Sequence, residues 1–377
     1  MKNILFILFK RYNGILEGGG LVNQRNVRMA EEILGKENVS VYYVHDDSRR
    51  RSLGNLALSA LYFPFGHFNG MLPGKIREIV RMAEGYDCVF ISTTVFGIVA
   101  RKLKDAGYKG RIVAHFHNVE SIYYDSLLPK RMPFRNIVIN CAAKNDAYCC
   151  RYADVVLALN ERDSHLLKKM YGRGADYLVP IALRDKCSQI AFNEDESTAK
   201  RPRLLFLGSS FTANNEGVLW FVQHVLPHVD AEFRVVGRDM DKLQAAHPCL
   251  RNVAVFSNVP SLEEHFLWAD FMVLPIFSGS GMKVKTCESM MYGRNILGTS
   301  ETFEGYHVDT ERIGRLCNTA QEYIDAITYY GEHPVKRYNA YAREMFLQQY
   351  SQEVSQQVFR QVLGGSPLQQ ETNGCEP

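Results

Sequence analysis

Residues 273–288 read VLPIFSGSGMKVKTCE, which is the pattern of a strand, a glycine-rich loop and the start of a helix. The apolar strand is expected to end at Pro275, and the helix to begin near Met282. Gly279 and Gly281 allow tight turns and a close approach of the backbone to a ligand. A strand that passes through such a loop into a helix is typical of an α/β sheet, in which ligands bind where the strands end.

The same alternation continues in both directions from this stretch. Helices are expected at 21–34, 95–106, 135–152, 216–225 and 283–292. The apolar or β-branched runs expected to form strands are 3–9, 39–44, 88–92, 111–116, 154–158, 177–179, 204–207, 232–236, 252–256, 271–274 and 295–297. Continuous apolar strands between helices indicate parallel sheets covered on both faces. We therefore predict an α/β fold with two Rossmann-like, doubly wound domains that face each other across a cleft.

A chain of 377 residues is too long for one compact core and favours two domains. The polar stretch 184–202 is the best candidate for a linker between a first domain, 1–183, and a second domain, 203–344. The helical segment at about 345–364 is expected to pack back on the first domain. The tail 365–377 is rich in Gly, Gln, Glu and Asn and is expected to be disordered.

Composition and motifs exclude several classes of protein. The net charge of +3 is too small for a dedicated nucleic-acid binder. The apolar run 4–9 is too short for a signal peptide, and no stretch reaches the roughly 18 apolar residues of a membrane-spanning helix. Nine cysteines without a C-x-x-C pair favour a reduced, cytosolic protein. The motifs G-x-S-x-G and H-E-x-x-H are absent, and no clean G-x-G-x-x-G follows a strand, which argues against a hydrolase, a zinc site and a dehydrogenase.

Two lysines lie where a helix normally disfavours positive charge. Lys283 and Lys285 fall in the first turn of the predicted helix, at the positive end of its dipole. A bound pyrophosphate would offset both charges and accept hydrogen bonds from the first-turn amides. Glu288, about one and a half turns further along, could then accept hydrogen bonds from a ribose diol. The alternative is a solvated helix start with Glu288 as a surface or salt-bridge residue.

The run from Gly279 to Gly293, GSGMKVKTCESMMYG, resembles the donor-site signature of family four (group 1) retaining glycosyltransferases of the GT-B fold. It is similar in particular to the subgroup pattern G-S-G-x-[RK]-x-K-x-x-E-x-x-x-x-G. The other matches to this subgroup are Phe206–Ser209, Asn214-Asn215, Trp220-Phe221, Leu226-Pro227, Val236–Arg238, Thr299-Ser300 and Glu304-Gly305. The resemblance covers residues 203–310 well and the N-terminal half loosely.

This resemblance implies that the second domain binds a nucleotide-sugar donor and the first an acceptor, with no cofactor and no metal ion. Glu288 would bind the ribose, and Lys283 and Lys285 the pyrophosphate. The remaining donor-binding residues that it implies are Ser280, Gly281 and Met282 through their amides, Gly208 and Ser209 beside the phosphates, Asn258 and Val259 beside the base, and Arg238.

Two departures from the family pattern leave Lys283 and Lys285 as the expected cations for the phosphates. Many members carry a pair of glutamates eight residues apart, and the first of these positions is Ser280 here. Many also carry an Arg and a Lys after the first strand of the second domain, and Ser210–Glu216 supplies neither. Lys283 and Lys285 are therefore expected to carry the phosphate charge and to act in catalysis.

Two segments of the first domain are candidates for the same site. Gly18, Gly19 and Gly20 follow the first strand and precede a helix, where a phosphate could bind, although a flexible surface loop would show the same residues. His117 and Glu120 follow the strand 111–116, at the end where catalytic groups collect. In the resembled family, a Gly-Gly loop at this place closes over the donor phosphate or the acceptor, and a histidine lies beside the donor sugar. The alternative for either His115 or His117 is a histidine satisfied in the core.

A third segment of this domain is basic and then aromatic. Arg49–Leu53 contains three arginines, and Tyr62, Phe63, Phe65 and Phe68 follow. Such a surface would suit a peripheral contact with the inner face of a membrane. A loop with a solvated charge cluster and a buried helix would show the same residues.

The leading functional hypothesis is a glycosyltransferase that moves a sugar from a nucleotide-sugar to a saccharide or lipid-linked saccharide. It is expected to act with retention and without metal, in the synthesis of a cell-surface polysaccharide, in the cytoplasm or at the inner membrane face. Two alternatives remain open. One is a nucleotide-sugar epimerase on the same fold, and the other is a non-catalytic subunit that binds a nucleotide-sugar.

Overall fold

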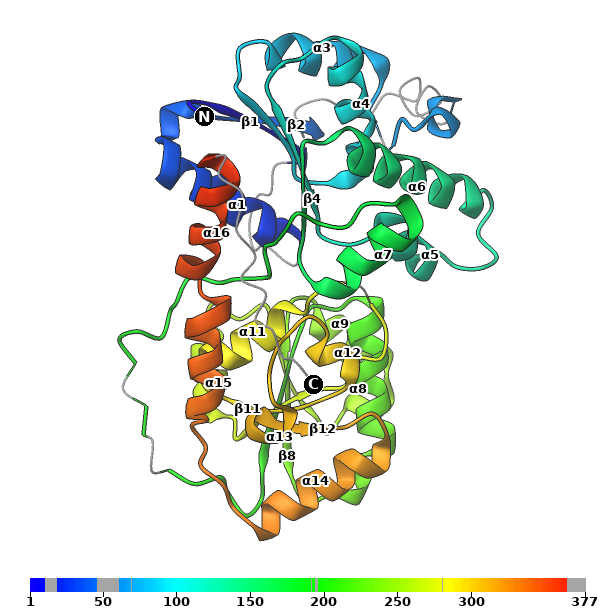
Figure 1. The fold of residues 1–377 in the computed structure, drawn as a ribbon. Coiled ribbons are helices and arrows are strands. Elements are labelled where there is room, and N and C mark those ends of the chain that lie inside the picture. Colours follow the sequence, from blue (N-terminus) through cyan, green and yellow to red (C-terminus); the bar gives the residue numbers. More distant parts are fainter. Residues whose placement is uncertain are drawn as a thin grey trace, which may run out of the picture. The chain divides into compact units, whose positions relative to one another are not determined.

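The computed structural model describes residues 1–10, 19–45, 61–68, 70–190, 192–193, 196–279 and 281–364. Its internal contacts divide the chain into two compact units (Figure 1). The first unit contains Met1–Pro180 together with the chain from Ser355 onward, and the second contains Ile181–Val354. The second unit therefore includes the polar stretch 184–202, and the predicted tail 365–377 lies outside the described residues.

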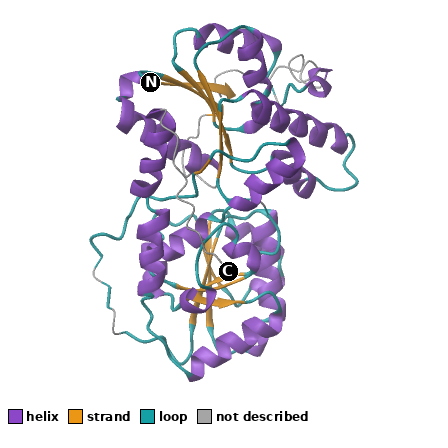
Figure 2. Cartoon of the chain, viewed as in Figure 1, coloured by secondary structure: helices purple, strands orange, loops and turns teal. Residues whose placement is uncertain are grey.

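The first unit is built on a six-stranded parallel sheet with the order β2-β1-β3-β4-β5-β6 (Figure 2). Its strands are β1 Ile4–Lys10, β2 Val39–His45, β3 Cys88–Ile91, β4 Arg111–Phe116, β5 Val155–Ala158 and β6 Tyr177–Leu178. Its helices are α1 Gly19–Leu34, α3 Pro73–Ala83, α4 Ile98–Asp105, α5 Glu120–Leu127, α6 Arg135–Tyr152, α7 Glu161–Tyr171 and, after Ser355, most of α16 Gln352–Gly364.

Alternate residues of β1 explain why its sequence is apolar throughout. Leu5 and Ile7 join a core cluster with side chains of α3, α4 and α6 on one face of the sheet. Ile4 and Phe6 join a second cluster with side chains of α1 and α16 on the other face. A strand that is buried on both faces has no solvent-facing positions, so it lacks the polar alternation of a half-exposed strand.

The second unit repeats the design with the strand order β12-β11-β10-β7-β8-β9, also parallel. Its strands are β7 Arg203–Leu207, β8 Glu232–Gly237, β9 Ala254–Ser257, β10 Phe271–Leu274, β11 Asn295–Gly298 and β12 Gly314–Leu316. Its helices are α8 Thr212–His224, α9 Met240–Ala246, α10 Glu263–Trp268, α11 Val284–Met291, α12 Ser300–Phe303, α13 Thr310–Ile313, α14 Ala320–Glu332 and α15 Ala340–Met345. β7 lies between β8 and β10, so the sheet reverses its winding direction there, and ligands typically bind at such a point.

Several element boundaries differ from the sequence prediction. α8 begins at Thr212, four residues before the predicted start, and the helix predicted at 95–106 is divided into a 3-10 turn, Thr94–Phe96, and α4. β12 was not predicted, because three residues carry too little pattern to identify a strand. None of the helices in the described part of the chain has the length and hydropathy required to span a lipid bilayer.

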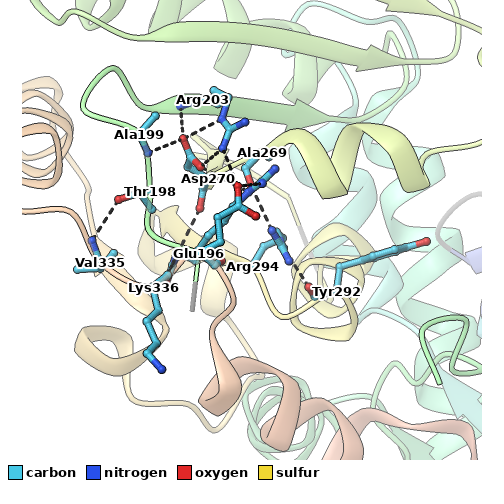
Figure 3. A network of polar contacts seen from close by, with 12 residues as sticks. Glu196, Thr198, Ala199, Arg203, Ala269, Asp270, Tyr292, Arg294, Val335 and Lys336 are labelled. Carbon is cyan, nitrogen blue, oxygen red and sulfur yellow. Dashed lines mark hydrogen bonds and ion pairs between the residues drawn. The ribbon is translucent and has the colours of Figure 1, made fainter. Parts of the chain in front are cut away.

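A network of ion pairs around a buried carboxylate lies at the edge of the second sheet where β7 and β10 begin (Figure 3). Asp270 is fully buried and accepts hydrogen bonds from the Arg203 side chain at 2.8 and 3.1 Å and from the Arg203 backbone amide at 2.9 Å. Nε of Arg337 lies 3.5 Å from the Asp270 carboxylate, and Nη1 of Arg337 contacts Glu196 at 2.5 Å. These contacts connect residues before β7 and residues after α14 to the centre of the sheet.

Candidate functional site

Three loops of the second unit are held together where the strands end. The Gly208 amide donates to the carbonyl of Val236 at 3.0 Å, and the Ser210 amide donates to the carbonyl of Arg238 at 2.8 Å. The Asn258 amide donates to the carbonyl of Gly237 at 3.1 Å. Since β7, β8 and β9 are parallel neighbours, these bonds extend their pairing into the loops. The predicted residues Gly208, Arg238 and Asn258 therefore lie at one edge of the sheet.

Glycine is required at two points of this edge. A Cβ at Gly237 would lie 1.8 Å from the carbonyl oxygen of Gly208, a distance that the backbone cannot accommodate. A Cβ at Gly208 would lie 2.7 Å from Nδ2 of Asn214 and 3.1 Å from Nζ of Lys285. The missing side chain of Gly208 is thus the space in which the Lys285 ammonium group lies against the backbone.

The Lys285 side chain is held in place by side chains distant in sequence. Its Nζ donates to Oδ1 of Asn214 at 2.5 Å and lies 4.7 Å from the ring centroid of Phe206. Nδ2 of Asn214 in turn donates to the carbonyl of Ser209 at 2.9 Å. The ammonium group is therefore fixed beside the loop after β7. Asn214 was recognised only as part of a motif; its contact with Lys285 spans 71 residues and has no signal in the sequence.

Lys283 has a different environment from Lys285. It is the N-cap of α11, so the helix begins one residue later than predicted. Its Nζ donates to Oε1 of Glu301 at 2.6 Å and to the carbonyl of Gly281 at 2.9 Å, and only 11% of its side chain is exposed. The charge of Lys283 is therefore balanced by a carboxylate of the protein. Sequence reasoning missed Glu301, and this pairing weakens the inference that both lysines require a bound anion.

The first turn of α11 retains features of an anion site. No described side chain caps this helix, so the first-turn amides face outward at the positive end of the dipole. Gly281 adopts a positive φ of 62°, which is the left-handed conformation that glycine tolerates. The Met282 side chain is buried, which leaves only its backbone for a ligand. Ser280 lies outside the described residues.

Glu288 lies in the second turn of α11, where its backbone carbonyl accepts from the Tyr292 amide at 3.1 Å, while its carboxyl group has no hydrogen bond within the described part of the chain. Burial raises the pKa of Glu288 to about 7, against the opposing effect of the Lys186 and Lys285 ammonium groups. A carboxyl group with this pKa loses its proton readily when a hydrogen-bond donor approaches it. It suits the predicted contact with ribose hydroxyls.

The predicted residues of the first unit form a separate group. α1 begins at Gly19, before the predicted start, and a Cβ on Gly19 would lie 3.4 Å from Nδ1 of His117. His117 is 9% exposed, and burial together with the Arg25 charge lowers the pKa of its imidazole to about 3. The ring is therefore neutral across the physiological range. Gly20 is buried in the first turn of α1, and Gly18 lies outside the described residues.

Glu120 is buried at the start of α5. Burial and the nearby Asp146 and Asp163 raise the pKa of Glu120 well above its ordinary value. Asp146 is itself fully buried, and burial raises its pKa to about 7. Glu120 therefore holds its proton to a higher pH than an exposed carboxyl group in a loop does.

Comparisons with known proteins agree with this architecture. Residues 201–332 match the family model described as Glycosyl transferases group 1. No curated protein matches the sequence at a significant level.

Similar solved structures include HepE from Anabaena in complex with UDP, which is 13% identical with a TM-score of 0.67. Sucrose-phosphate synthase from Thermosynechococcus elongatus is 13% identical with a TM-score of 0.68. Each of these similarities covers 97% of this chain and 100% of the other. A glycosyltransferase from Rickettsia africae is 12% identical over 97% of this chain and 100% of the other, with a TM-score of 0.60.

At such low identity the solved structures establish the fold, and the family model supplies the class of enzyme. The predicted pair of Rossmann-like domains is confirmed, as is the prediction of a glycosyltransferase at the level of this domain. The chain has the GT-B fold and carries a group 1 glycosyltransferase domain over residues 201–332.

Proposed function

We propose that this chain transfers a sugar from a nucleotide-sugar, bound at the carboxyl edge of the second sheet, to a saccharide or lipid-linked saccharide. The observation that carries the proposal is the Lys285 ammonium group, which Asn214 holds against Gly208 beside the uncapped start of α11. This arrangement presents a cation and helix amides to one compact anion. Structures of the similar HepE contain UDP and UDP-glucose, which are ligands of this kind.

The catalytic roles of these groups follow from where negative charge develops during sugar transfer. When the glycosidic bond to the nucleoside diphosphate breaks, negative charge accumulates on the leaving phosphate. Lys285 and the first amides of α11 would stabilise that charge more in the transition state than in the ground state. Lys283, held by Glu301, would add a second and partly neutralised cation. Because these groups supply the positive charge, we expect turnover without a divalent metal ion.

The remaining parts of the proposal concern the product and its use. By resemblance to family four, the anomeric configuration of the donor would be retained, and the product would enter a cell-surface polysaccharide. His117 in the first unit would contact the sugar as a neutral imidazole, since its low pKa excludes a charged form at neutral pH. An NMR spectrum of the first-formed product, before it mutarotates or reacts further, tests retention.

A ligand screen followed by product analysis tests the function itself. Thermal shift with a panel of nucleotides and nucleotide-sugars should identify a donor, because a ligand that binds only the native state raises the unfolding midpoint. The best donor is then incubated alone and with a panel of saccharide and lipid-linked acceptors. An acceptor-linked sugar supports the transferase. A new nucleotide-sugar from donor alone indicates an epimerase, and binding without turnover indicates a silent subunit.

The pKa of Glu288 predicts how donor affinity depends on pH. With a pKa of about 7, Glu288 is mainly protonated at pH 6 and ionised at pH 8. If only the carboxylate accepts both ribose hydrogen bonds, affinity falls as the pH falls, and the Kd at pH 6 should be about 10-fold higher than at pH 8. Calorimetry with the best nucleotide-sugar measures this ratio. Glu288→Gln should bind weakly at both pH values, and a wild-type Kd that does not change would contradict the role of Glu288.

The acceptor side of the proposal includes a contact with an anionic membrane surface. Of the aromatic residues that suggested it, Phe65 is 67% exposed, whereas Phe68 is buried against Tyr124. Arg49–Leu53 lies outside the described residues. α5, the connection that follows it and the start of α6 expose further apolar side chains, namely Ile122, Leu127, Met132, Phe134 and Ile137. We call residues 122–137 the α5–α6 tip.

Charge and shape favour a lipid surface at this tip. Lys130 and Arg131 are exposed between the apolar side chains, and Phe134, with φ 62°, is 77% exposed. The tip lies at the outer end of α6 (Figure 1). Basic groups would contact lipid phosphates while the apolar side chains enter the interface.

Vesicle binding tests the α5–α6 tip. The protein should sediment with vesicles that contain phosphatidylglycerol and not with pure phosphatidylcholine, and added salt should weaken the binding. The double variant Lys130→Glu, Arg131→Glu should reduce the partition coefficient at least about 10-fold, because each basic residue near the surface contributes about 1 kcal/mol. Lys36→Glu, on an exposed residue elsewhere in the same unit, serves as the control. Equal binding by the double variant and this control would refute the contact.

A further inference from the structure

Three buried residues of the first unit lead from α1 to His117. Arg25 is 6% exposed, and Asn26 and His115 are fully buried. Nε and Nη2 of Arg25 donate to Oδ1 of Asn26 at 3.3 and 3.0 Å, and Nη1 donates to the carbonyl of Pro180 at 2.6 Å. The guanidinium group thereby determines the orientation of the Asn26 amide, because the opposite orientation would place the NH₂ group of Asn26 against these same N–H donors.

The orientation of Asn26 determines where His115 carries its proton. Nδ2 of Asn26 lies 2.8 Å from Nδ1 of His115. Since Nδ2 can only donate, Nδ1 must accept with a lone pair, so the neutral ring carries its hydrogen on Nε2. Burial, with the nearby His117 and Arg25, lowers the pKa of His115 well below its ordinary value, which agrees with a neutral ring.

His115 is in turn packed between two rings. The centroid of its ring lies 4.8 Å from that of His117 with the planes at 85°, and 6.1 Å from that of Phe90 at 87°. Nε2 of His117 is buried and has no hydrogen-bond partner in the described part of the chain, whereas Nδ1 is the atom that faces Gly19. The position of the His117 ring therefore depends on the ring of His115.

We propose that Arg25, Asn26 and His115 are positioning residues that hold the His117 imidazole with Nδ1 toward the start of α1, and so orient it for the sugar contact that the proposed function assigns to it. This inference rests on the proposed function for the place of the sugar. The hydrogen bonds that connect Arg25, Asn26 and His115 are independent of the proposed function, because the contacts themselves define them. None of the three positioning residues needs to touch the substrate.

Nitrogen NMR of the full-length protein, labelled at histidine, tests the hydrogen bonds that connect Arg25, Asn26 and His115. His115 and His117 signals are assigned with single His→Asn variants. In the wild type, His115 should show a protonated Nε2 and an unprotonated Nδ1. Asn26→Asp still accepts from Arg25 but cannot donate, so it should move the proton of His115 to Nδ1. Asn26→Ala should shift the ring signals of His117, although residue 26 does not contact that ring in any hydrogen bond described above.

Asn23→Ala is the matched control. Asn23 is 3% exposed on the same helix and accepts a hydrogen bond from Ser92, away from the chain that ends at His117. Asn26→Ala should lower kcat about 10- to 100-fold with little change in KM for the donor, because a misplaced contact group costs rate more than binding. Asn23→Ala should leave kcat and the His117 signals near wild type, even if it lowers stability equally.

Three results separate failure of this inference from failure of the proposed function. A protonated Nδ1 on His115 in the wild type would contradict the proposed positioning of His117. Identical His117 signals in the Asn26→Ala and Asn23→Ala variants would also contradict it. If the ring signals respond as expected but His117→Ala retains full activity, the positioning of His117 by Arg25, Asn26 and His115 is supported, and the assignment of His117 to the sugar site fails.

Discussion

Lys285→Met is expected to lower kcat/KM for sugar transfer by about 10²- to 10³-fold, the usual effect of removing one group that stabilises developing charge. The substitution keeps an apolar side chain of similar length and removes the ammonium group that lies over Phe206 and beside Gly208. Asn214→Ala should cause a smaller loss, because it releases the ammonium group without removing it. Steady-state rates with the donor identified by thermal shift measure both effects.

Lys283→Met provides the critical comparison with Lys285→Met. Since Glu301 already balances the charge of Lys283 at 2.6 Å, its loss should cost less in kcat/KM than the loss of Lys285. Lys200→Met, on an exposed residue before β7, should leave the rate unchanged. All variants should keep the wild-type thermal midpoint within a few degrees. A Lys285→Met enzyme with wild-type activity would remove the central support for the proposed donor site.

Asp270→Ala is expected to destabilise the second unit by about 3–5 kcal/mol, the usual cost of removing one partner from a buried ion pair. The substitution leaves the buried guanidinium groups of Arg337 and Arg294 near each other without the carboxylate that offsets them. Burial and the Arg337 charge already lower the pKa of Arg294 to about 10. The effect should therefore exceed that of an ordinary surface ion pair.

Urea unfolding followed by tryptophan fluorescence measures this loss in the correct unit. The chain has two tryptophans, Trp220 and Trp268, and both lie in the second unit. Asp230→Ala is the matched control, because Asp230 pairs with Arg201 at 3.0 Å but 88% of its side chain is exposed. That variant should change the free energy of unfolding by less than about 1 kcal/mol. Equal effects of the two substitutions would show that the network adds no stability.

The fold was predictable from sequence because its signal is local and repeated. Each strand buried on both faces needs a continuous apolar run, and each helix between strands needs its own periodicity, so the α/β class is visible in many short windows. Short elements such as β12 and the exact start of α8 depend on tertiary contacts and were missed or displaced. The predicted donor loop was found for the same local reason, since its glycines, lysines and Glu288 lie within one stretch.

By itself, the sequence determined the two parallel α/β sheets, the glycine-rich loop after β10 and the presence of two lysines and a carboxylate at the next helix. Only the tertiary structure decided how these charges are balanced. Glu301 neutralises Lys283 from the short helix α12, 18 residues later, and Asn214 holds Lys285 from a helix 71 residues earlier. The physical reason is that charge balance and burial depend on side chains that approach through space, and their separation along the chain carries no periodic signal.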